Sequence, residues 1–244
     1  MSGMRLLNVT AADLGKLRTL PVFVIAAVGT AVIGATMVAA LAAYAAEQGT
    51  PVSSTDVTIQ AIPFVQAGLI LLGVLPVAHE HTGSQLSTTL AVVPRRGLLL
   101  AGKTLATLVA VALTAAATVG GSLVAAALTR HLVDAPVDDD GGGPWPVLGA
   151  TTYLVLVGLL AHAVALLLRH LVPALVGTLS LVLIVSPLLA GLTEHARWLP
   201  DRAAMQLYDP ADAVLTATTG ALVMIAWIVL VGAPAAVLFV RCDP

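Results

Sequence analysis

The sequence predicts an all-α, polytopic membrane protein with six transmembrane helices. Three observations lead to this fold class: 59% of the 244 residues are hydrophobic, only 10% are charged, and the apolar residues fall in six long blocks. Soluble domains carry about 25% charged residues. A helix of roughly 20 apolar residues crosses the hydrocarbon core of a bilayer. Because lipid offers no hydrogen-bond partner, each span must satisfy its own backbone, as a helix does.

The predicted spans occupy residues 21–44, 59–77, 98–128, 147–167, 171–189 and 220–240. Since most connections are short, residues 1–244 are expected to form a single transmembrane domain. Two other segments are predicted beside the spans. The apolar and basic residues of 6–20 suit an interfacial helix on the cytoplasmic surface, and the half-apolar stretch 191–219 suits an outer re-entrant or capping segment. Pro187 is expected to break the fifth span and begin that excursion.

The lysines and arginines predict the orientation of the spans. Eight lie on one side and three on the other, which places both termini in the cytoplasm by the positive-inside rule. The inner set is Arg5, Lys16, Arg18, Arg95, Arg96, Lys103, Arg169 and Arg241, and the outer set is Arg130, Arg197 and Arg202. Most carboxylates, including Asp138–Asp140, fall on the outer side. The net charge of −2 gives no reason to expect a nucleic-acid partner.

Two predicted spans carry rows of small residues at a spacing of four, which allow helices to approach closely in lipid. The first row is Ala27, Ala31, Ala35, Ala39 and Ala43, and the second is Ala110, Thr114, Thr118, Ser122 and Ala126. In so Ala-rich a chain, composition alone also produces such rows.

Gly97–Thr104 satisfies the nucleotide-binding pattern G-x-x-x-x-G-K-T letter for letter. A working P-loop follows a buried strand of a soluble α/β domain. Here Gly97 follows Pro94-Arg-Arg96, and Thr104 runs directly into a predicted span. We therefore interpret the match as accidental and expect this chain to hold no cofactor.

Neither a catalytic set nor a metal site is predicted. His79-Glu80-His81 lacks helical zinc-site spacing, because adjacent side chains diverge by about 100° on a helix. Three adjacent carboxylates at 138–140 supply too few oxygens for calcium. His162 is the one His, Lys, Arg, Asp or Glu well inside a predicted span. It is either an intramembrane polar site, such as a proton relay or substrate path, or a neutral His hydrogen-bonded to a neighbouring helix.

Between the second and third predicted spans the chain carries Glu80, Leu86, Thr88-Thr-Leu-Ala-Val92 and Pro94-Arg-Arg96. These residues match the pattern E-Y-R-H-G-T-I-R-T-T-L-A-V-x-P-R-R. The segment thereby resembles type-2 ATP-binding-cassette (ABC) transporter permeases, of the six-helix bacterial kind. Lys16-Leu-Arg-Thr19 is similar to the family's interfacial helix, and Lys103 to a lysine early in its third span. Ser84-Gln85 departs from the family's Gly-Thr, with Gly83 one place early.

The resemblance implies that the chain is the transmembrane permease subunit of an ABC exporter in a bacterial cytoplasmic membrane. Such a subunit is not itself an enzyme. A separate cytoplasmic ATPase binds ATP and Mg, a second copy of the chain or a related permease completes the transporter, and a hydrophobic or amphipathic substrate moves outward through the bilayer. The coupling segment, 79–96, would dock on the ATPase through Glu80, Gly83, Ser84, Leu86, Thr88, Thr89, Leu90, Pro94, Arg95 and Arg96. The alternatives are a membrane-embedded enzyme and a partner-binding immunity or assembly protein without transport.

Overall fold

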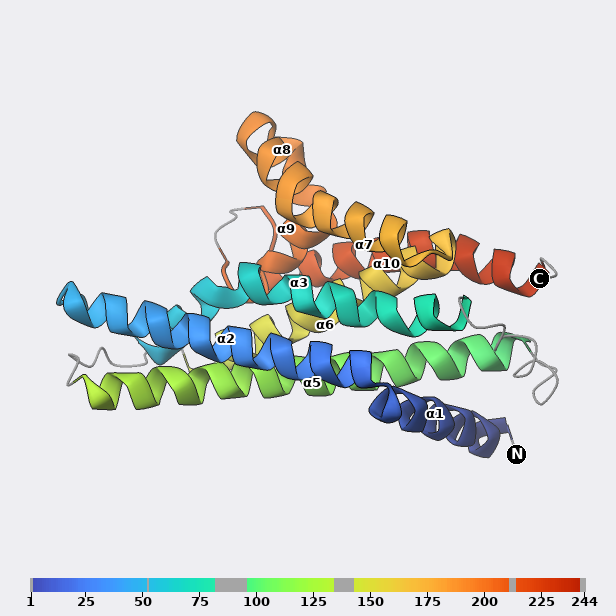
Figure 1. The fold of residues 1–244 in the computed structure, drawn as a ribbon. Coiled ribbons are helices and arrows are strands. Elements are labelled where there is room, and N and C mark those ends of the chain that lie inside the picture. Colours follow the sequence, from blue (N-terminus) through green and yellow to red (C-terminus); the bar gives the residue numbers. More distant parts are fainter. Residues whose placement is uncertain (1, 52, 82–95, 134–142, 211–213, 242–244) are drawn as a thin grey trace.

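The computed structural model describes residues 2–51, 53–81, 96–133, 143–210 and 214–241. These residues are almost entirely helical and include no strand (Figure 1). In chain order the helices are α1 (Ser2–Thr19), α2 (Pro21–Glu47), α3 (Ser54–His81), α5 (Arg96–Leu132), α6 (Trp145–Leu168), α7 (Leu171–Ser180), η1 (Leu181–Val185), α8 (Ser186–Leu192), η2 (Glu194–Trp198), α9 (Pro200–Met205) and α10 (Ala217–Arg241).

The predicted fold class, an all-α protein with six membrane-spanning helices, is confirmed. Within the described residues, six helical stretches are long and apolar enough to cross a bilayer: Pro21–Glu47, Ser54–Ala78, Gly97–Leu132, Trp145–Leu168, Leu171–Leu192 and Ala217–Leu238. Each contains most or all of one predicted span. The protein is therefore a multi-pass membrane protein.

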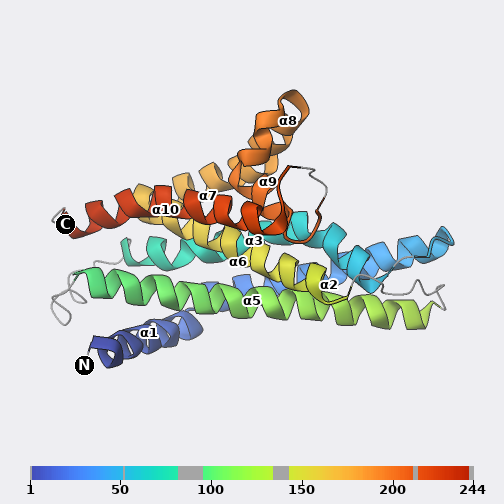
Figure 2. The ribbon, with the colours of Figure 1, turned by 180° about the vertical axis from the view of Figure 1, so that it is seen from behind.

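Helices α3 and α6 form the centre of the bundle. They pack against each other, α5 and α2 lie along one side of them, and α10 packs against α6 (Figures 1 and 2). Large apolar side chains cover the outer surface of the bundle. Ile25, Leu113 and Leu222, for example, are 60–70% exposed. Such side chains need a lipid solvent rather than water, which agrees with the spans.

Glycines set the distance between α3 and α6. A Cβ atom on Gly73 of α3 would overlap the carbonyl oxygen of Gly158 in α6. A Cβ atom on Gly158 would in turn meet Val111 of α5. The two backbones touch because neither residue has a side chain, and this close approach is the usual means of packing helices in lipid.

The two rows of small residues differ in how deeply they are buried. All five residues of the α5 row, from Ala110 to Ala126, are buried, and Gly34 of α2 packs over Thr118 and Ser122. The alanine row of α2 is only half-buried. The buried face of α2 is the neighbouring row of Phe23, Thr30, Gly34, Val38 and Ala42. The alanine row therefore lies beside the buried face of α2 rather than on it.

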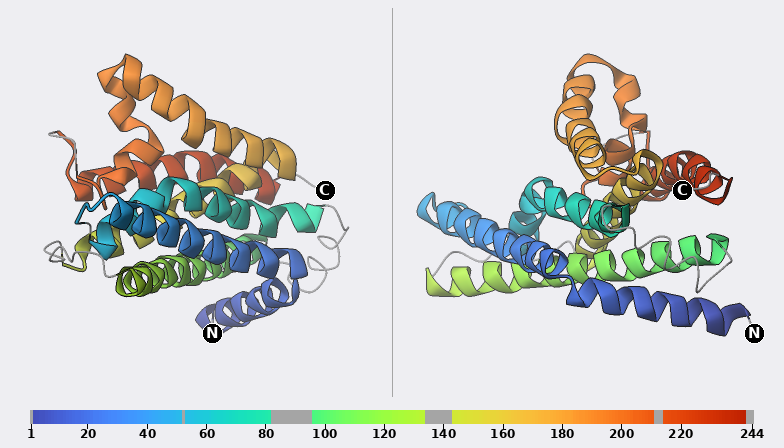
Figure 3. Two further views of the ribbon diagram at one scale, coloured as in Figure 1. Left: turned by 60° about the vertical axis from the view of Figure 1, so that its left-hand side comes forward. Right: turned by 45° about the vertical axis from the view of Figure 1, so that its right-hand side comes forward.

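The N-terminal helix α1 diverges from α2 and runs beside the first turns of α5 (Figure 3). The chain bends at Leu20, whose backbone is extended, and α2 begins at Pro21. Proline suits the first position of a helix because its missing N–H has no partner there in any case. Among residues 9–19, whose burial the structure describes, Thr10, Asp13 and Leu17 are buried, and Leu14 packs against the core. The face that packs inward therefore combines leucines with polar side chains.

The fifth span does not break at Pro187. It runs as α7, η1 and α8 to Leu192, with a π-helical turn over Leu181–Val185 immediately before the proline. A π turn re-routes the backbone hydrogen bonds, which accommodates a residue without an N–H. The helix ends only at Thr193, whose backbone is extended. The helix therefore continues past Pro187 to Leu192 before the segment after the fifth span begins.

The segment after the fifth span packs over the helices. Its short helix α9 contacts α6 and α10, and Ala203, Ala204, Leu207 and Tyr208 are buried. The backbone of Leu207 reaches Gly149 near the start of α6 so closely that a Cβ there would overlap it. This segment thus closes over the end of the bundle at which α6 begins.

Candidate functional site

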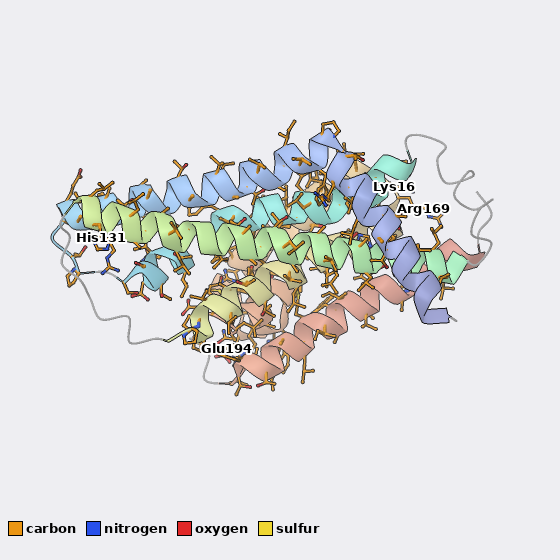
Figure 4. The ribbon with its side chains drawn as sticks, turned by 90° about the horizontal axis from the view of Figure 1, so that it is seen from below. Lys16, His131, Arg169 and Glu194 are labelled. Carbon is orange, nitrogen blue, oxygen red and sulfur yellow. The ribbon has the colours of Figure 1, made fainter. Side chains whose placement is uncertain are left out.

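The two ends of the bundle differ in character. Both termini lie at one end (Figure 1), and Lys16 and Arg169 lie at that end in Figure 4. His131 lies at the opposite end in the same view. We call the end with the termini, Lys16 and Arg169 the basic end.

The predicted coupling segment begins and ends at the basic end. Glu80 lies in the last turn of α3, and Arg96 is the first residue of α5. The intervening predicted residues lie outside the described part of the chain: Gly83, Ser84, Leu86, Thr88, Thr89, Leu90, Pro94 and Arg95. Asp138–Asp140 also lie outside it. The coupling role of these residues stays a prediction.

Helix α1 docks onto α5 directly after the coupling segment. Val9 fills the space above Gly102, where a Cβ would overlap it. The neighbouring Lys103 is buried, with only 7% of its surface exposed. On α1, Lys16 pairs with Asp13 at 3.6 Å between Nζ and Oδ1. The contact joins α1 to the helix that follows the predicted coupling segment.

The stretch that matches the P-loop pattern is helical. Gly97–Thr104 forms the first two turns of α5, and the Thr104 hydroxyl donates to the Leu100 carbonyl at 3.0 Å. In a P-loop, a glycine-rich loop turns its backbone N–H groups toward phosphates. Within a helix, most of these groups bond to carbonyls instead. The shape of this stretch supports the interpretation of a chance match, and the absence of nucleotide binding stays a prediction.

His162 lies at the centre of the bundle, 1% exposed. Its Nδ1 is 3.2 Å from the carbonyl oxygen of Gly73 in α3. Because a carbonyl only accepts, Nδ1 must carry the hydrogen, which leaves Nε2 as an acceptor. Nε2 has no hydrogen-bond partner in the described residues. The bond to α3 is a contact that the second interpretation of His162 expects, and which of the two interpretations holds stays a prediction.

A polar cluster lies where α3 and α6 meet the segment that follows the fifth span. The Tyr153 hydroxyl in α6 donates to Gln66 Oε1 in α3 at 2.5 Å, and its ring meets that of Tyr208 edge-on, with centroids 5.1 Å apart. Asp201 is 6% exposed, and its Oδ2 lies 4.0 Å from Arg202 Nε. We call Gln66, Tyr153, Asp201, Arg202 and Tyr208 the outer polar cluster.

Burial controls the ionisation of this cluster. It raises the pKa of Asp201 above its ordinary value of 3.8, while Ser186 beside it and the charge of Arg202 oppose the shift. The Ser186 hydroxyl is close but short of hydrogen-bond geometry: Ser186 Oγ and Asp201 Oδ1 have no hydrogen-bond partner in the described residues. Burial also raises the pKa of Tyr208. The cluster thus favours neutral forms of its acids.

A pocket of about 480 Å³ opens beside the cluster. Its wall consists of the end of α8, η2, α9 and the chain leading to α10. The lining residues are Ala190, Thr193, Glu194, Ala196, Arg197, Arg202, Met205, Gln206, Asp209 and Val214. The pocket combines charged groups of both signs with two other polar residues and four apolar ones.

No protein-family model matches this chain, and no curated protein matches it either.

Sequence analysis missed the outer polar cluster. One signal was present: Gln66 stands inside a predicted span, where a polar side chain needs a partner. Its partner Tyr153 is 87 residues away in the chain, and no spacing rule connects the two. Asp201 and Arg202 gave no signal, since a charged pair in an outer loop normally stays in water.

Proposed function

We propose that this chain is the transmembrane permease subunit of an ABC exporter. The observation that carries the proposal is the position of α3 and α5 at the basic end. The permease-like segment connects these two helices there, on the same end as both termini and beside the docked helix α1. A cytoplasmic ATPase that binds this end would contact the connection between α3 and α5 and the exposed face of α1 together.

The packing offers a path from that contact to the spans. The central helix α3 carries Glu80 in its last turn and packs along α6, with Gly73 against Gly158. A rigid shift of the coupling segment would therefore move the centre of the bundle rather than a peripheral helix. Small displacements at such a contact drive rigid-body rearrangements because packed interfaces switch between discrete arrangements.

The partner supplies the energy in this proposal. ATP and Mg bind to the separate ATPase, both termini face the cytoplasm of a bacterial cell, and a second copy of the chain or a related permease completes the transporter. The apolar outer surfaces of the helices suit a hydrophobic or amphipathic substrate that moves outward through the bilayer. The chain alone neither binds nor hydrolyses ATP.

Co-purification tests the proposal. The tagged chain is isolated from its native membranes, and the captured proteins are identified by mass spectrometry. We expect an ATPase subunit with its own nucleotide-binding motifs, and we expect Leu86→Asp to abolish its capture. The matched control is Leu132→Asp, because Leu132 is 78% exposed at the far end of α5. Capture that is absent in the parent chain, or equal in both variants, would contradict the proposal.

A further inference from the structure

The outer half of the fifth span is held loosely to the bundle. One row of residues along the span is buried, namely Ala174, Thr178, Val182 and Ser186, whereas most of the span is not. Within the described residues, α8 packs mainly against its chain neighbours η1 and η2, and Figure 1 shows it rising away from the bundle. Segments with so few buried contacts move at the least cost in free energy.

The last buried residue of this row, Ser186, lies at a weak point of the helix. The π-helical turn Leu181–Val185 precedes it, and Pro187 follows it. Sharp bends in helices occur at π turns and at prolines, because both disturb the regular backbone hydrogen bonds. The helix can therefore bend most easily beside Ser186.

Ser186 meets Asp201 of α9 at this weak point. Ser186 is fully buried and Asp201 is 6% exposed, and the hydroxyl lies close enough to the carboxyl to affect its pKa. Ser186 Oγ and Asp201 Oδ1 have no hydrogen-bond partner in the described residues. By contrast, Thr178 on the same row donates to the Ala174 carbonyl at 2.8 Å. The Ser186 hydroxyl thus remains available to the carboxyl of another element.

Burial decides which form of Asp201 this contact accepts. A hydroxyl can donate to a carboxylate or accept from a carboxylic acid, so Ser186 alone selects neither form. An ionised carboxylate that is buried with one oxygen unpartnered is costly, and a proton removes that cost. Burial accordingly raises the pKa of Asp201 above 3.8, against the opposing effects of Ser186 and Arg202.

The side chains around Asp201 offer one partner for its ionised form. Arg202 Nε lies 4.0 Å from Asp201 Oδ2 and has no hydrogen-bond partner in the described residues. On α6, the Tyr153 hydroxyl already donates to Gln66. At the end of α9, burial raises the pKa of Tyr208, which keeps it neutral. An ionised Asp201 would therefore turn toward Arg202 and water.

Two other elements pack against α9. On η2, Arg197 Nη2 lies 3.2 Å from Glu194 Oε2, and His195 is exposed. Residues 217–240 of α10 include no charged side chain. Among the described residues of these two elements, His195 is thus the group to be controlled for in a pH experiment, since histidines ordinarily change charge between about pH 5 and 8.

We propose that Asp201 is a proton-operated latch between α9 and the fifth span. When Asp201 is protonated, its carboxyl stays buried against Ser186 and holds the outer half of the span against α9. When it loses the proton, it turns to Arg202 and water, and the span bends away at the π turn and Pro187. The latch stands apart from the proposed transport function, because it requires no ATPase.

A distance measurement on the purified full chain in detergent tests the latch. Spin labels are attached to cysteines that replace Leu188 on α8 and Leu222 on α10, which are 63% and 60% exposed, in a Cys242→Ser background. The distance distribution is recorded between about pH 4 and about pH 8, above the ordinary pKa of a carboxyl group. We expect one short, narrow distance at low pH and a longer, broader distribution after a single transition as the pH rises.

Three variants assign the groups. Asp201→Asn, which stays neutral, should keep the short distance at every pH. Ser186→Ala should lower the short-distance population at low pH about three- to tenfold, as expected for one hydrogen bond. Arg202→Gln should move the transition to higher pH, because Arg202 supports the ionised carboxylate.

Two controls accompany these variants. Ser180→Ala removes a half-buried hydroxyl earlier in the same span, and His195→Gln removes the exposed histidine of η2. Both should behave as the parent chain does. Thermal unfolding at each pH confirms that the fold is kept, and Asp201→Asn and Ser186→Ala keep the test decisive if Arg202→Gln unfolds.

Three results would overturn the proposal. A parent distance that does not change with pH would remove the latch. A transition that persists in Asp201→Asn, or disappears in His195→Gln, would assign the proton to another group. A Ser186→Ala variant that matches Ser180→Ala would show that Ser186 does not hold Asp201.

Discussion

The Nδ1 atom of His162 in α6 lies 3.2 Å from the carbonyl oxygen of Gly73 in α3. The same glycine faces Gly158, one turn before His162, without room for a Cβ between the two backbones. One short stretch of α3 therefore makes both a close backbone contact with α6 and the buried histidine bond. This stretch fixes how the two central helices sit against each other.

Replacing Gly73 tests that contact. Gly73→Ala should destabilise the protein by about 1–3 kcal/mol, as overpacking does, because the new Cβ meets the backbone of Gly158 rather than a movable side chain. The measurement is the thermal unfolding midpoint in detergent. Gly120→Ala is the matched control: its Cβ meets nothing within 4 Å, so it should be neutral or stabilise α5 by up to about 1 kcal/mol. Equal melting of the two variants would argue against the tight crossing.

The bond between Tyr153 and Gln66 is tested by a double-mutant cycle. Tyr153→Phe and Gln66→Leu should each lower the unfolding midpoint, because each leaves one buried polar group without its partner. The double variant should lose less than the sum of the two, with a coupling energy of about 0.6–1.7 kcal/mol, the range for such bonds in membranes. Additive losses would mean that the two side chains do not interact.

Much of the fold could be predicted from the sequence because hydropathy and length decide it. The blocks at 21–44 and 147–167, for example, became α2 and α6 with a few residues added. The features that the sequence did not predict share a cause, because each depends on tertiary contacts. Packing against α5 buries Thr10 and Asp13 of α1 beside Leu17, and packing against α3 and α5 buries Gly34 of α2 rather than the alanine row. The π turn before Pro187 has no sequence signature of its own.

The site was less predictable than the fold. His162 was found because one ionisable residue in an apolar span stands out, whereas its partner Gly73 offers only a backbone carbonyl, which every residue has. Arg202 and Asp209 belong to an outer segment in which charges are ordinary. Only the packing of α9 against α6 and α10 buries Arg202 Nε and forms the pocket beside it.

The stability of the outer segment should depend on pH through Asp201. Burial raises the pKa of Asp201 in the folded protein above its ordinary 3.8. Its protonated form is therefore favoured by folding, and the associated stability is complete below 3.8 and is lost as pH rises through the folded pKa. Asp201→Asn, which stays neutral, should melt above the parent chain at pH 7.5.

That difference should shrink as the pH is lowered toward 3.8. The control is Glu47→Gln, which removes an exposed carboxylate at the end of α2 and should leave the pH profile unchanged. A parent chain and an Asp201→Asn variant with parallel profiles would show that Asp201 titrates normally.

Cysteine accessibility tests the orientation of the spans. In a Cys242→Ser background, single cysteines at Lys16 and Arg95 should react only with membrane-permeant reagents in intact cells. A cysteine at Glu194, whose side chain is 90% exposed, should react with impermeant ones. The reason is the excess of lysine and arginine at the basic end. Labelling of residue 95 from outside would invert the topology and remove the coupling segment from the reach of a cytoplasmic ATPase.

ATP hydrolysis by the reconstituted complex tests the coupling role of residues 79–96, and with it the central claim, most directly. The chain and its co-purified ATPase are placed in liposomes, and hydrolysis is compared between the parent complex and the double variant Glu80→Ala, Leu86→Asp, with Leu132→Asp as control. We expect hydrolysis and transport to fall in the double variant while expression and dimer formation persist, because a lost charge-assisted bond costs about 1.5–3 kcal/mol and tilts the segment without unfolding the spans. Full activity of the double variant would contradict the assignment of a coupling segment and, with it, the proposed function.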